Sequence, residues 1–295
     1  MSELIVVSEE VATALRERGP VVALETTLVA HGFPAPEGIE VALLSEAAVR
    51  EAGAVPATVG VLDGAIRVGL TREELARFTP DARKAGPRDL AACAVSGEVG
   101  ATTVGGTLAV ARTAGIRFLG TGGIGGVHRG WPTPPDVSAD IVTLVSSRVL
   151  VACSGAKSLL DVPATMEYLE TLGIPVLGFH TDTLPLFYSA AGGPAVPQRV
   201  DDVRAAARTA AAHWDLGGCG LVLAQPPPTS LEVEGLIEEA LAEAGRQGVS
   251  GQRVTPFVLA FLHERSGGRT LEVNRGLIVA NARLAAEVAV AYAAL

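Results

Sequence analysis

The sequence alternates short apolar runs with longer amphipathic stretches over most of its length. Apolar runs rich in β-branched residues predict strands, and apolar residues that recur every three to four positions predict helices. The predicted strands are Leu4–Val7, Val21–Leu28, Thr58–Leu62, Ile116–Gly120, Val149–Ala152, Val176–Phe179 and Leu221–Ala224. The predicted helices are Gly38–Glu51, Arg72–Phe78, Leu108–Ala114, Pro163–Leu172, Asp201–Trp214, Ser230–Gln247, Thr255–Ser266 and Asn274–Ala294. This alternation favours an α/β fold with a mixed, largely parallel sheet covered on both faces.

The chain of 295 residues is predicted to form a single domain, 1–295, because composition does not shift around its loop-rich segments. A net charge of −9 argues against nucleic acid as a partner, and any phosphate needs a local binding device. The N-terminal residues contain no basic leader, and we expect no membrane span and a cytoplasmic location. Three cysteines without CxxC spacing suit reduced, buried thiols: Cys93, Cys153 and Cys219.

Lysine is rare in this chain. The sequence contains 23 Lys or Arg residues, and only Lys84 and Lys157 are lysines. Either cation serves on a solvated surface, so the two lysines are candidates for sites that need a compact amine which can lose its proton. The alternative is a residual surface lysine or a structural ion pair.

The ends of the predicted strands carry the polar side chains that could perform chemistry, since ligands of open α/β sheets bind there. Glu25 interrupts the apolar segment Ala23–Thr27, and a carboxyl in an apolar site favours its protonated form, which suits a proton donor. The alternative is a glutamate that anchors a turn through hydrogen bonds. Lys157 follows an apolar strand through Ser154-Gly155-Ala156, where loss of solvent would free the lone pair of the amine for imine formation. The alternative is a lysine that reaches into solvent.

Three further segments suit anion or cation binding. Lys84 precedes Gly86-Pro87-Arg88-Asp89 and could bind a phosphate, although Arg88 and Asp89 could simply pair with each other. The segment Gly100–Thr107 leads into a helix whose first N–H groups could hold an anion, and Thr121–Gly130 is glycine-rich without the dinucleotide-binding spacing. Either glycine stretch could equally be a tight turn.

Two carboxylates follow the pair Pro134-Pro135. Asp136 and Asp140 are spaced by about one helical turn, and carboxylates on one helical face can divide metal binding from proton transfer. The alternative is that Asp136 caps the helix and Asp140 is solvated.

Six motifs, in this order, resemble the pseudouridine-5′-phosphate glycosidase family, also called the indigoidine synthase A-like family: ALETTLVAHG, KAGPRDL, GATTVGGT, TGGIGGVHRG, DVSAD and CSGAKSLLD. The resemblance runs essentially from end to end. It implies a three-layer α/β/α sandwich, a homotrimer, one divalent ion such as Mn²⁺ per subunit, and reversible cleavage of pseudouridine 5′-phosphate to uracil and ribose 5-phosphate in pseudouridine catabolism.

The resemblance also assigns roles to individual residues. It places the proton donor on Glu25, the lysine nucleophile on Lys157 and the metal ligand on Asp136. It implies substrate contacts at the following positions: Lys84, Val104 through its backbone, His128, Ser138, Ala139, Asp140 and Asn281.

A C-glycosidic bond has no leaving oxygen to protonate, so the usual two-carboxylate route fails. We therefore expect the sugar ring to open, with Asp140 assisting protonation of the ring oxygen, Lys157 forming an iminium at C1′ and Glu25 protonating the base carbon. The rival interpretations are a Schiff-base aldolase acting on another sugar phosphate, and a sugar-phosphate sensor or scaffold without turnover.

Overall fold

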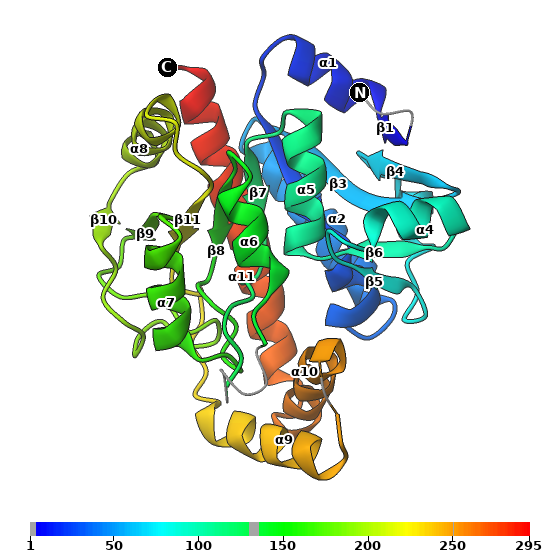
Figure 1. Ribbon diagram of the computed structural model, residues 1–295, viewed down its shortest axis with the longest axis vertical. Helices are drawn as coiled ribbons and strands as arrows, with labels where there is room; N and C mark the ends of the chain where they lie inside the picture. The colour runs from blue at the N-terminus through cyan, green and yellow to red at the C-terminus, as the bar shows by residue number, and fades with distance from the viewer. Residues whose placement is uncertain (1–3, 130–135, 250) are drawn as a thin grey trace.

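One mixed sheet runs through the computed structural model, which describes residues 4–129, 136–249 and 251–295 (Figure 1). Its strands are β1 (Ile5–Val7), β2 (Val21–Glu25), β3 (Val55–Leu62), β4 (Ala65–Val68), β5 (Arg83–Ala85), β6 (Gly100–Thr102), β7 (Phe118–Gly120), β8 (Leu150–Cys153), β9 (Val176–Phe179), β10 (Gln198–Val200) and β11 (Leu221–Ala224). The strand order is β1-β4-β3-β2-β7-β8-β11-β9-β10, with β6 paired to β3 and β5. Within the described residues every pair is parallel except β3–β4 and β3–β6, which confirms the mixed, largely parallel sheet.

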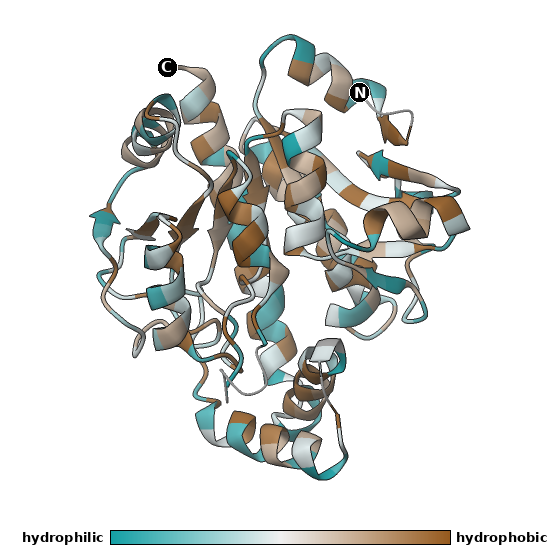
Figure 2. Ribbon diagram, viewed as in Figure 1, coloured by the Kyte–Doolittle hydropathy of each residue, from teal (hydrophilic) through white to brown (hydrophobic). Residues whose placement is uncertain are grey.

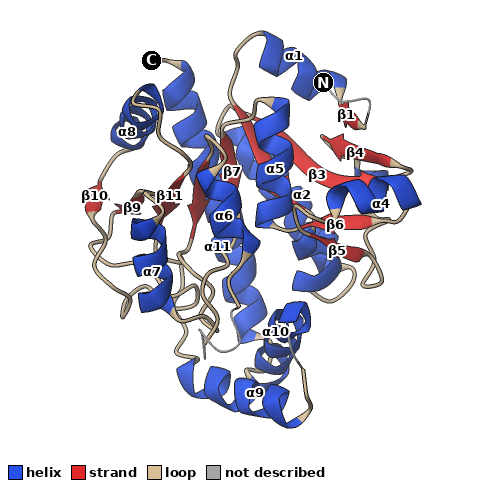
Figure 3. Ribbon diagram, viewed as in Figure 1, coloured by secondary structure: helices blue, strands red, loops and turns tan. Residues whose placement is uncertain are grey.

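Helices cover the sheet (Figure 3). They are α1 (Glu9–Arg16), α2 (Glu37–Glu51), α3 (Arg72–Leu75), α4 (Leu90–Ser96), α5 (Val104–Ala114), α6 (Ala139–Val145), α7 (Val162–Thr171), α8 (Val203–Asp215), α9 (Glu234–Arg246), α10 (Val254–Arg265) and α11 (Arg269–Ala293), with a π-helix at Leu28–Gly32 and a 3₁₀ turn at Gly251–Arg253. Helices α2 and α8 both pack on α11, while α5 packs on α6.

The two faces of the sheet bury separate apolar clusters. In β2, Val22 and Leu24 belong to a cluster with α8 and α11, while Val21 and Ala23 belong to the cluster that α5 and α6 complete. Successive side chains of a strand point to opposite faces, so β2 is buried on both. Apolar colour on the central strands and on the helix faces beside them shows the same arrangement (Figure 2). These two helical layers confirm the three-layer sandwich.

Helices α9, α10 and α11 depart from the simple alternation of strands and helices. Helices α9 and α10 pack on each other at the end of the molecule away from the two chain termini (Figure 1). Helix α11 is long and apolar enough to cross a membrane by length and composition alone, but it contacts β2, β7, β8, α2 and α8. Those contacts make it the central helix of one layer.

The structure corrects several element boundaries. The predicted strand Val21–Leu28 ends at Glu25, and the chain then turns into the π-helix Leu28–Gly32. The pattern missed β4, β5, β6 and β10 together with helix α1, while the helix expected after Asp136 is present as α6. The missed strands have three or four residues, too few for a period to be recognised. Cys93 and Cys153 are buried and free as expected, whereas Cys219 is only half-buried.

Candidate active site

Three neighbouring parallel strands carry the first part of the site at their carboxyl ends. In the register of the sheet, Leu24 of β2 lies beside Gly120 of β7, and Gly120 lies beside Ala152 of β8. The next residues along these strands are therefore neighbours too. This register brings Glu25 beside Thr121 and places the turn that carries Lys157 next to both.

Glu25 is a buried carboxyl with one free oxygen. Its side chain is 5% exposed, and Oε1 accepts a hydrogen bond from the Thr121 hydroxyl. Oε2 is buried and has no hydrogen-bond partner among the described residues. Burial raises the pKa of Glu25, and the Lys157 charge and the Thr121 hydrogen bond only partly oppose this. The structure thus favours a protonated carboxyl over a glutamate that merely anchors a turn.

Lys157 lies on an irregular segment rather than on a helix or strand. Its backbone N–H donates to Ile124 O at 3.2 Å, and Ile124 N–H donates to Gly155 O at 3.1 Å. Gly155 has a φ of +79°, and a Cβ there would lie 1.9 Å from Pro185 O, so the turn needs glycine. The glycine-rich segment after β7 therefore holds the lysine turn after β8.

Lys84 approaches the same place from β5. The residue is half-buried, and burial, reinforced by the Lys157 charge, lowers the Lys84 pKa to about 8. Its position beside Thr103 gives access to the first turn of α5, where Gly105 N–H donates to Asp140 and Gly106 N–H donates to Thr103. The N–H of Val104, the first helical residue, has no acceptor within the helix. Val104 itself is buried and is not among the residues that line either cavity, so the expected backbone contact through Val104 stays a prediction.

Asp140 joins two glycine segments. Its carboxylate accepts hydrogen bonds from Gly105 N–H at 2.7 Å and Gly125 N–H at 2.8 Å, and its side chain is 5% exposed. A Cβ on Gly125 would lie 2.8 Å from the same carboxylate, so the close approach requires glycine. The alternative of a solvated Asp140 is wrong.

Asp136 lines the same cavity as Asp140 but is more exposed. Ser138, not Asp136, caps α6, with its hydroxyl accepting from Asp140 N–H at 3.2 Å, so the capping alternative for Asp136 is also wrong. The Asp136 carboxylate is 42% exposed and lies 3.8 Å from Nδ1 of His128. Burial lowers the His128 pKa, and the Asp136 charge only partly opposes this. Gly130 and the pair Pro134-Pro135 lie outside the described residues.

Two adjoining cavities collect most of these side chains. The larger, of about 530 Å³, is lined by many charged and polar side chains; the candidates that line it are Lys84, His128, Asp136, Ser138, Ala139, Asp140 and Lys157. The smaller, of about 70 Å³, holds Glu25 and Thr121 among apolar side chains such as Leu28, Phe33, Phe187 and Ile278. Lys84 and Lys157 line both cavities. The two lysines therefore stand where a polar and an apolar compartment meet.

Two asparagines of α11 behave differently from each other. The Asn281 amide donates to Thr121 O at 2.7 Å and accepts from the Gln225 amide at 2.8 Å, and Asn281 is not among the residues that line either cavity. It holds the Thr121 segment rather than facing a ligand. Asn274 lines the smaller cavity, and its buried Oδ1 has no partner among the described residues. The family resemblance points to Asn281, whereas Asn274, two helical turns earlier, is the asparagine of α11 that lines a cavity.

Helix α10 was also missed as part of the site. Thr255 lines both cavities, while Pro256 and Leu259 line the smaller one. These residues cover the strand ends from the opposite side. Their amphipathic pattern predicted a helix but could not show which element it faces.

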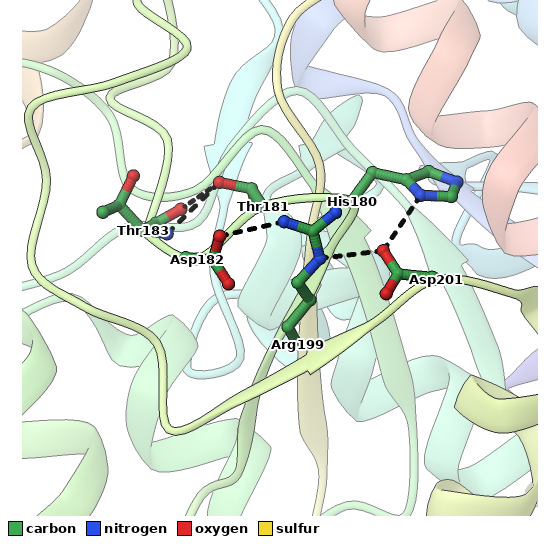
Figure 4. Close-up of polar contacts among 6 residues, drawn as sticks. All are labelled: His180, Thr181, Asp182, Thr183, Arg199 and Asp201. Carbon is green, nitrogen blue, oxygen red and sulfur yellow. Dashed lines mark hydrogen bonds and ion pairs between the residues drawn. The ribbon is translucent and has the colours of Figure 1, made fainter.

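A separate polar cluster lies at the edge strand β10. Arg199 donates to Asp182 at 2.9 Å and Asp201 at 2.8 Å, and His180 Nδ1 lies 3.3 Å from Asp201 (Figure 4). All four side chains are largely exposed. None of them is among the residues that line the two cavities.

Sequence comparison places the chain among known proteins. The family model described as indigoidine synthase A like protein matches residues 10–291. A protein of Herpetosiphon aurantiacus named pseudouridine-5′-phosphate glycosidase is 47% identical, with 97% of each chain covered. Another of that name, from Paracoccus denitrificans, is 48% identical and covers 99% of this chain and all of its own.

Two solved structures share the fold. The prealnumycin C-glycosynthase in complex with ribulose 5-phosphate has a TM-score of 0.90 and 42% identity, covering 100% of this chain and 98% of its own. The indigoidine synthase A-like protein of Thermotoga maritima has a TM-score of 0.87 and 38% identity, covering 97% and 96%.

Proposed function

The chain belongs to the indigoidine synthase A like family, and from this premise we propose how its residues cleave the C-glycosidic bond of pseudouridine 5′-phosphate. The enzyme releases uracil and ribose 5-phosphate in a reversible reaction. One observation carries the assignment of roles: Lys157 stands at the junction of the polar and the apolar cavity. A substrate that spans the junction places its sugar phosphate in the polar cavity, its base in the apolar one, and C1′ beside the amine.

The sugar phosphate suits the larger cavity because that cavity supplies separate groups for an anion. Lys84 offers an ammonium and Ser138 offers a hydroxyl, and both line this cavity with Thr103 at the start of α5. Helix N-termini and lysine ammonium groups both bind phosphate. These contacts hold the sugar while leaving C1′ exposed to Lys157.

Lys157 attacks C1′ as the bond from C1′ to the ring oxygen breaks. The ring oxygen leaves as a hydroxyl and takes the proton that the attacking nitrogen gives up. Asp140 is suited to relay this proton rather than supply one, because both of its oxygens already accept backbone N–H groups. The product is an open-chain sugar bonded to both the lysine nitrogen and the base.

Glu25 then protonates the base carbon bonded to C1′. The nitrogen lone pair expels neutral uracil as the carbon–carbon bond breaks, which leaves an iminium between Lys157 and the sugar. Water adds to the iminium and releases ribose 5-phosphate, and the proton freed in this step restores Glu25. Burial favours the protonated Glu25 at the start, and its unpartnered Oε2 is the oxygen available to hold that proton.

Asn274 is suited to receive the base. Asn274 lines a cavity of about 70 Å³ with mainly apolar side chains, and its buried Oδ1 has no partner among the described residues. An amide oxygen accepts from an N–H group, and uracil offers two such groups at the edge of a flat ring. Apolar walls and one unpaired acceptor favour uracil over a base that lacks a donor there.

The larger cavity offers one half-exposed carboxylate, Asp136, as a ligand for a divalent ion. No group of three His, Cys, Asp or Glu side chains forms a metal cage in the part of the chain that the structure describes. Asp136 is a half-exposed carboxylate beside a cavity with space for water, and Mn²⁺ or Mg²⁺ can bind through one carboxylate, several waters and a substrate phosphate. Asp136 would hold such an ion, whose charge would offset that of the phosphate.

We further propose that the enzyme works as a homotrimer. One exposed apolar side chain of the larger cavity supports this, since Val142 of α6 is 60% exposed and lines that cavity. Light scattering on the purified protein measures the subunit number directly.

The proposed function is tested by uracil release from pseudouridine 5′-phosphate, with and without Mn²⁺. Wild type should release uracil, and borohydride should trap a sugar phosphate on Lys157, located by mass spectrometry. Lys157→Ala should release none. An active enzyme whose Lys157 stays unmodified would contradict the lysine mechanism. Release of a triose instead of uracil would support the aldolase interpretation.

A further inference from the structure

The segment 157–160, which carries Lys157, separates two cavities. On one side lies the larger substrate cavity, which Lys157 and Leu160 line. On the other side lies a different cavity of about 730 Å³, lined by Ser158 and Leu160 together with Arg129 and Glu234. A segment without helix or strand that has open space on both sides needs bonds that hold it in place.

Arg129 supplies these bonds from the glycine-rich segment. Its Nη2 donates to Ser158 O at 2.9 Å, and its Nε lies 3.4 Å from Leu160 O. The same Nη2 also donates to the Glu234 carboxylate at 2.8 Å. One planar guanidinium thus binds two backbone carbonyls of this segment and one carboxylate, a pattern that the single ammonium of lysine cannot reproduce.

Glu234 connects this guanidinium to the cover over the site. It is the first residue of α9, and α9 packs on α10. Helix α10 supplies Thr255 and Leu259 to the substrate cavities. Ile237 of α9 and Leu262 of α10 also line a small cavity together with Lys157, Ser158 and Leu159.

We propose that Arg129 is a positioning residue that fixes the Lys157 segment and ties it to the α9–α10 cover, so that the amine is aligned when the cover is in place. Arg129 is not among the residues that line either substrate cavity, so it acts through the backbone of Ser158 and Leu160. The assignment of Lys157 as the nucleophile rests on the proposed function. The mechanical role of Arg129 rests on its own contacts.

The experiment compares kcat and KM for uracil release by wild type, Arg129→Gln, Arg129→Lys and Glu234→Gln. Displacing a reacting group by about 1 Å costs roughly 100-fold, so we expect Arg129→Gln to lower kcat by about 10- to 100-fold with KM nearly unchanged. Arg129→Lys should recover only part of the rate. Glu234→Gln should lose less than Arg129→Gln, because the two carbonyl bonds remain.

Hydrogen exchange of the peptide that covers 157–161 gives a readout independent of activity. Exchange should be faster in Arg129→Gln than in wild type, since the segment loses the two hydrogen bonds that Arg129 donates to its carbonyls. The matched control is Arg199→Gln. It also removes an ion-paired arginine, but Arg199 pairs with two carboxylates that lie outside both cavities (Figure 4). This control should keep the wild-type kcat and the wild-type exchange at 157–161.

Three results would overturn the proposal: an unchanged kcat in Arg129→Gln, a loss confined to KM, or an equal loss of kcat in Arg199→Gln. If Arg129→Gln does not fold, a wild-type kcat in both Arg129→Lys and Glu234→Gln overturns it instead. An active wild type with unmodified Lys157 would reject the proposed nucleophile, while the exchange rates and kcat ratios still test Arg129. The two failures are therefore distinguishable.

Discussion

Asp140→Asn should weaken the fold as well as the site. In the native chain both carboxylate oxygens accept backbone N–H groups, from Gly105 at 2.7 Å and from Gly125 at 2.8 Å. An asparagine can keep one acceptor, but its NH₂ group then meets the other backbone N–H. Leaving a buried donor unpaired costs about 1–3 kcal/mol, and the surviving bond loses roughly 1 kcal/mol with its charge.

The sum is a loss of about 2–4 kcal/mol in the free energy of unfolding. A change of 1 kcal/mol shifts Tm by about 2–4 °C in chains of somewhat smaller size, so we expect Tm to fall by about 5–15 °C. Thermal unfolding followed by circular dichroism, without substrate or metal, measures this. The matched control is Asp136→Asn, whose carboxylate is 42% exposed and which should keep the wild-type Tm. If Asp140→Asn unfolds at the wild-type temperature, the carboxylate does not join the two glycine segments as described.

Three further predictions concern the two cavities. Glu25→Gln should lower kcat for uracil release by about 10²- to 10⁴-fold, the usual contribution of a general acid. Because burial raises the Glu25 pKa, the wild-type kcat should fall as the pH rises through that pKa, and a rate that stays constant would contradict the donor role. Lys84 has a pKa of about 8, so its ammonium is present below this pH and lost above it. KM should therefore rise above about pH 8 in wild type, and Lys84→Met should lose this pH dependence of KM while binding more weakly throughout. Asn274→Leu should raise Tm, because it removes a buried acceptor that lacks a partner, and should lower kcat/KM by about 10- to 100-fold, equivalent to 1–3 kcal/mol; equal kcat/KM values would show that the base does not contact Asn274.

The sequence predicted the fold well where the signal was local. Alternating apolar and amphipathic segments indicated the sheet and its helical layers, since burial of strands on both faces requires apolar runs. The sequence pattern did not predict β5 and β6. These strands have three residues each and are defined by pairing, β5 with β6 and β6 with β3. Pairing between distant segments leaves no period in a three-residue stretch.

In the candidate site, too, local sequence signals were readable and long-range contacts were not. Glu25 and Lys157 were found because Glu25 ends one apolar strand and Lys157 comes shortly after another, and the carboxyl ends of parallel strands meet at one edge. Asn274 was missed because α11 buries several of its faces, and only the docking of that helix decides which polar side chain meets the cavity. The spacing of Asp136 and Asp140 suggested one helical face, yet α6 begins after Asp136 and separates their environments.

The two compartments make different electrostatic demands on the groups that line them. Burial is the leading influence on the pKa of both Glu25 and Lys84, and in each case it favours the neutral form. A neutral carboxyl suits the apolar cavity, where it must donate a proton to carbon. A partly neutral amine alone suits the polar cavity poorly, but a phosphate dianion that enters there favours the ammonium form of Lys84. Arginine would stay charged throughout and could not form the iminium that cleavage requires, so an amine is needed at the junction.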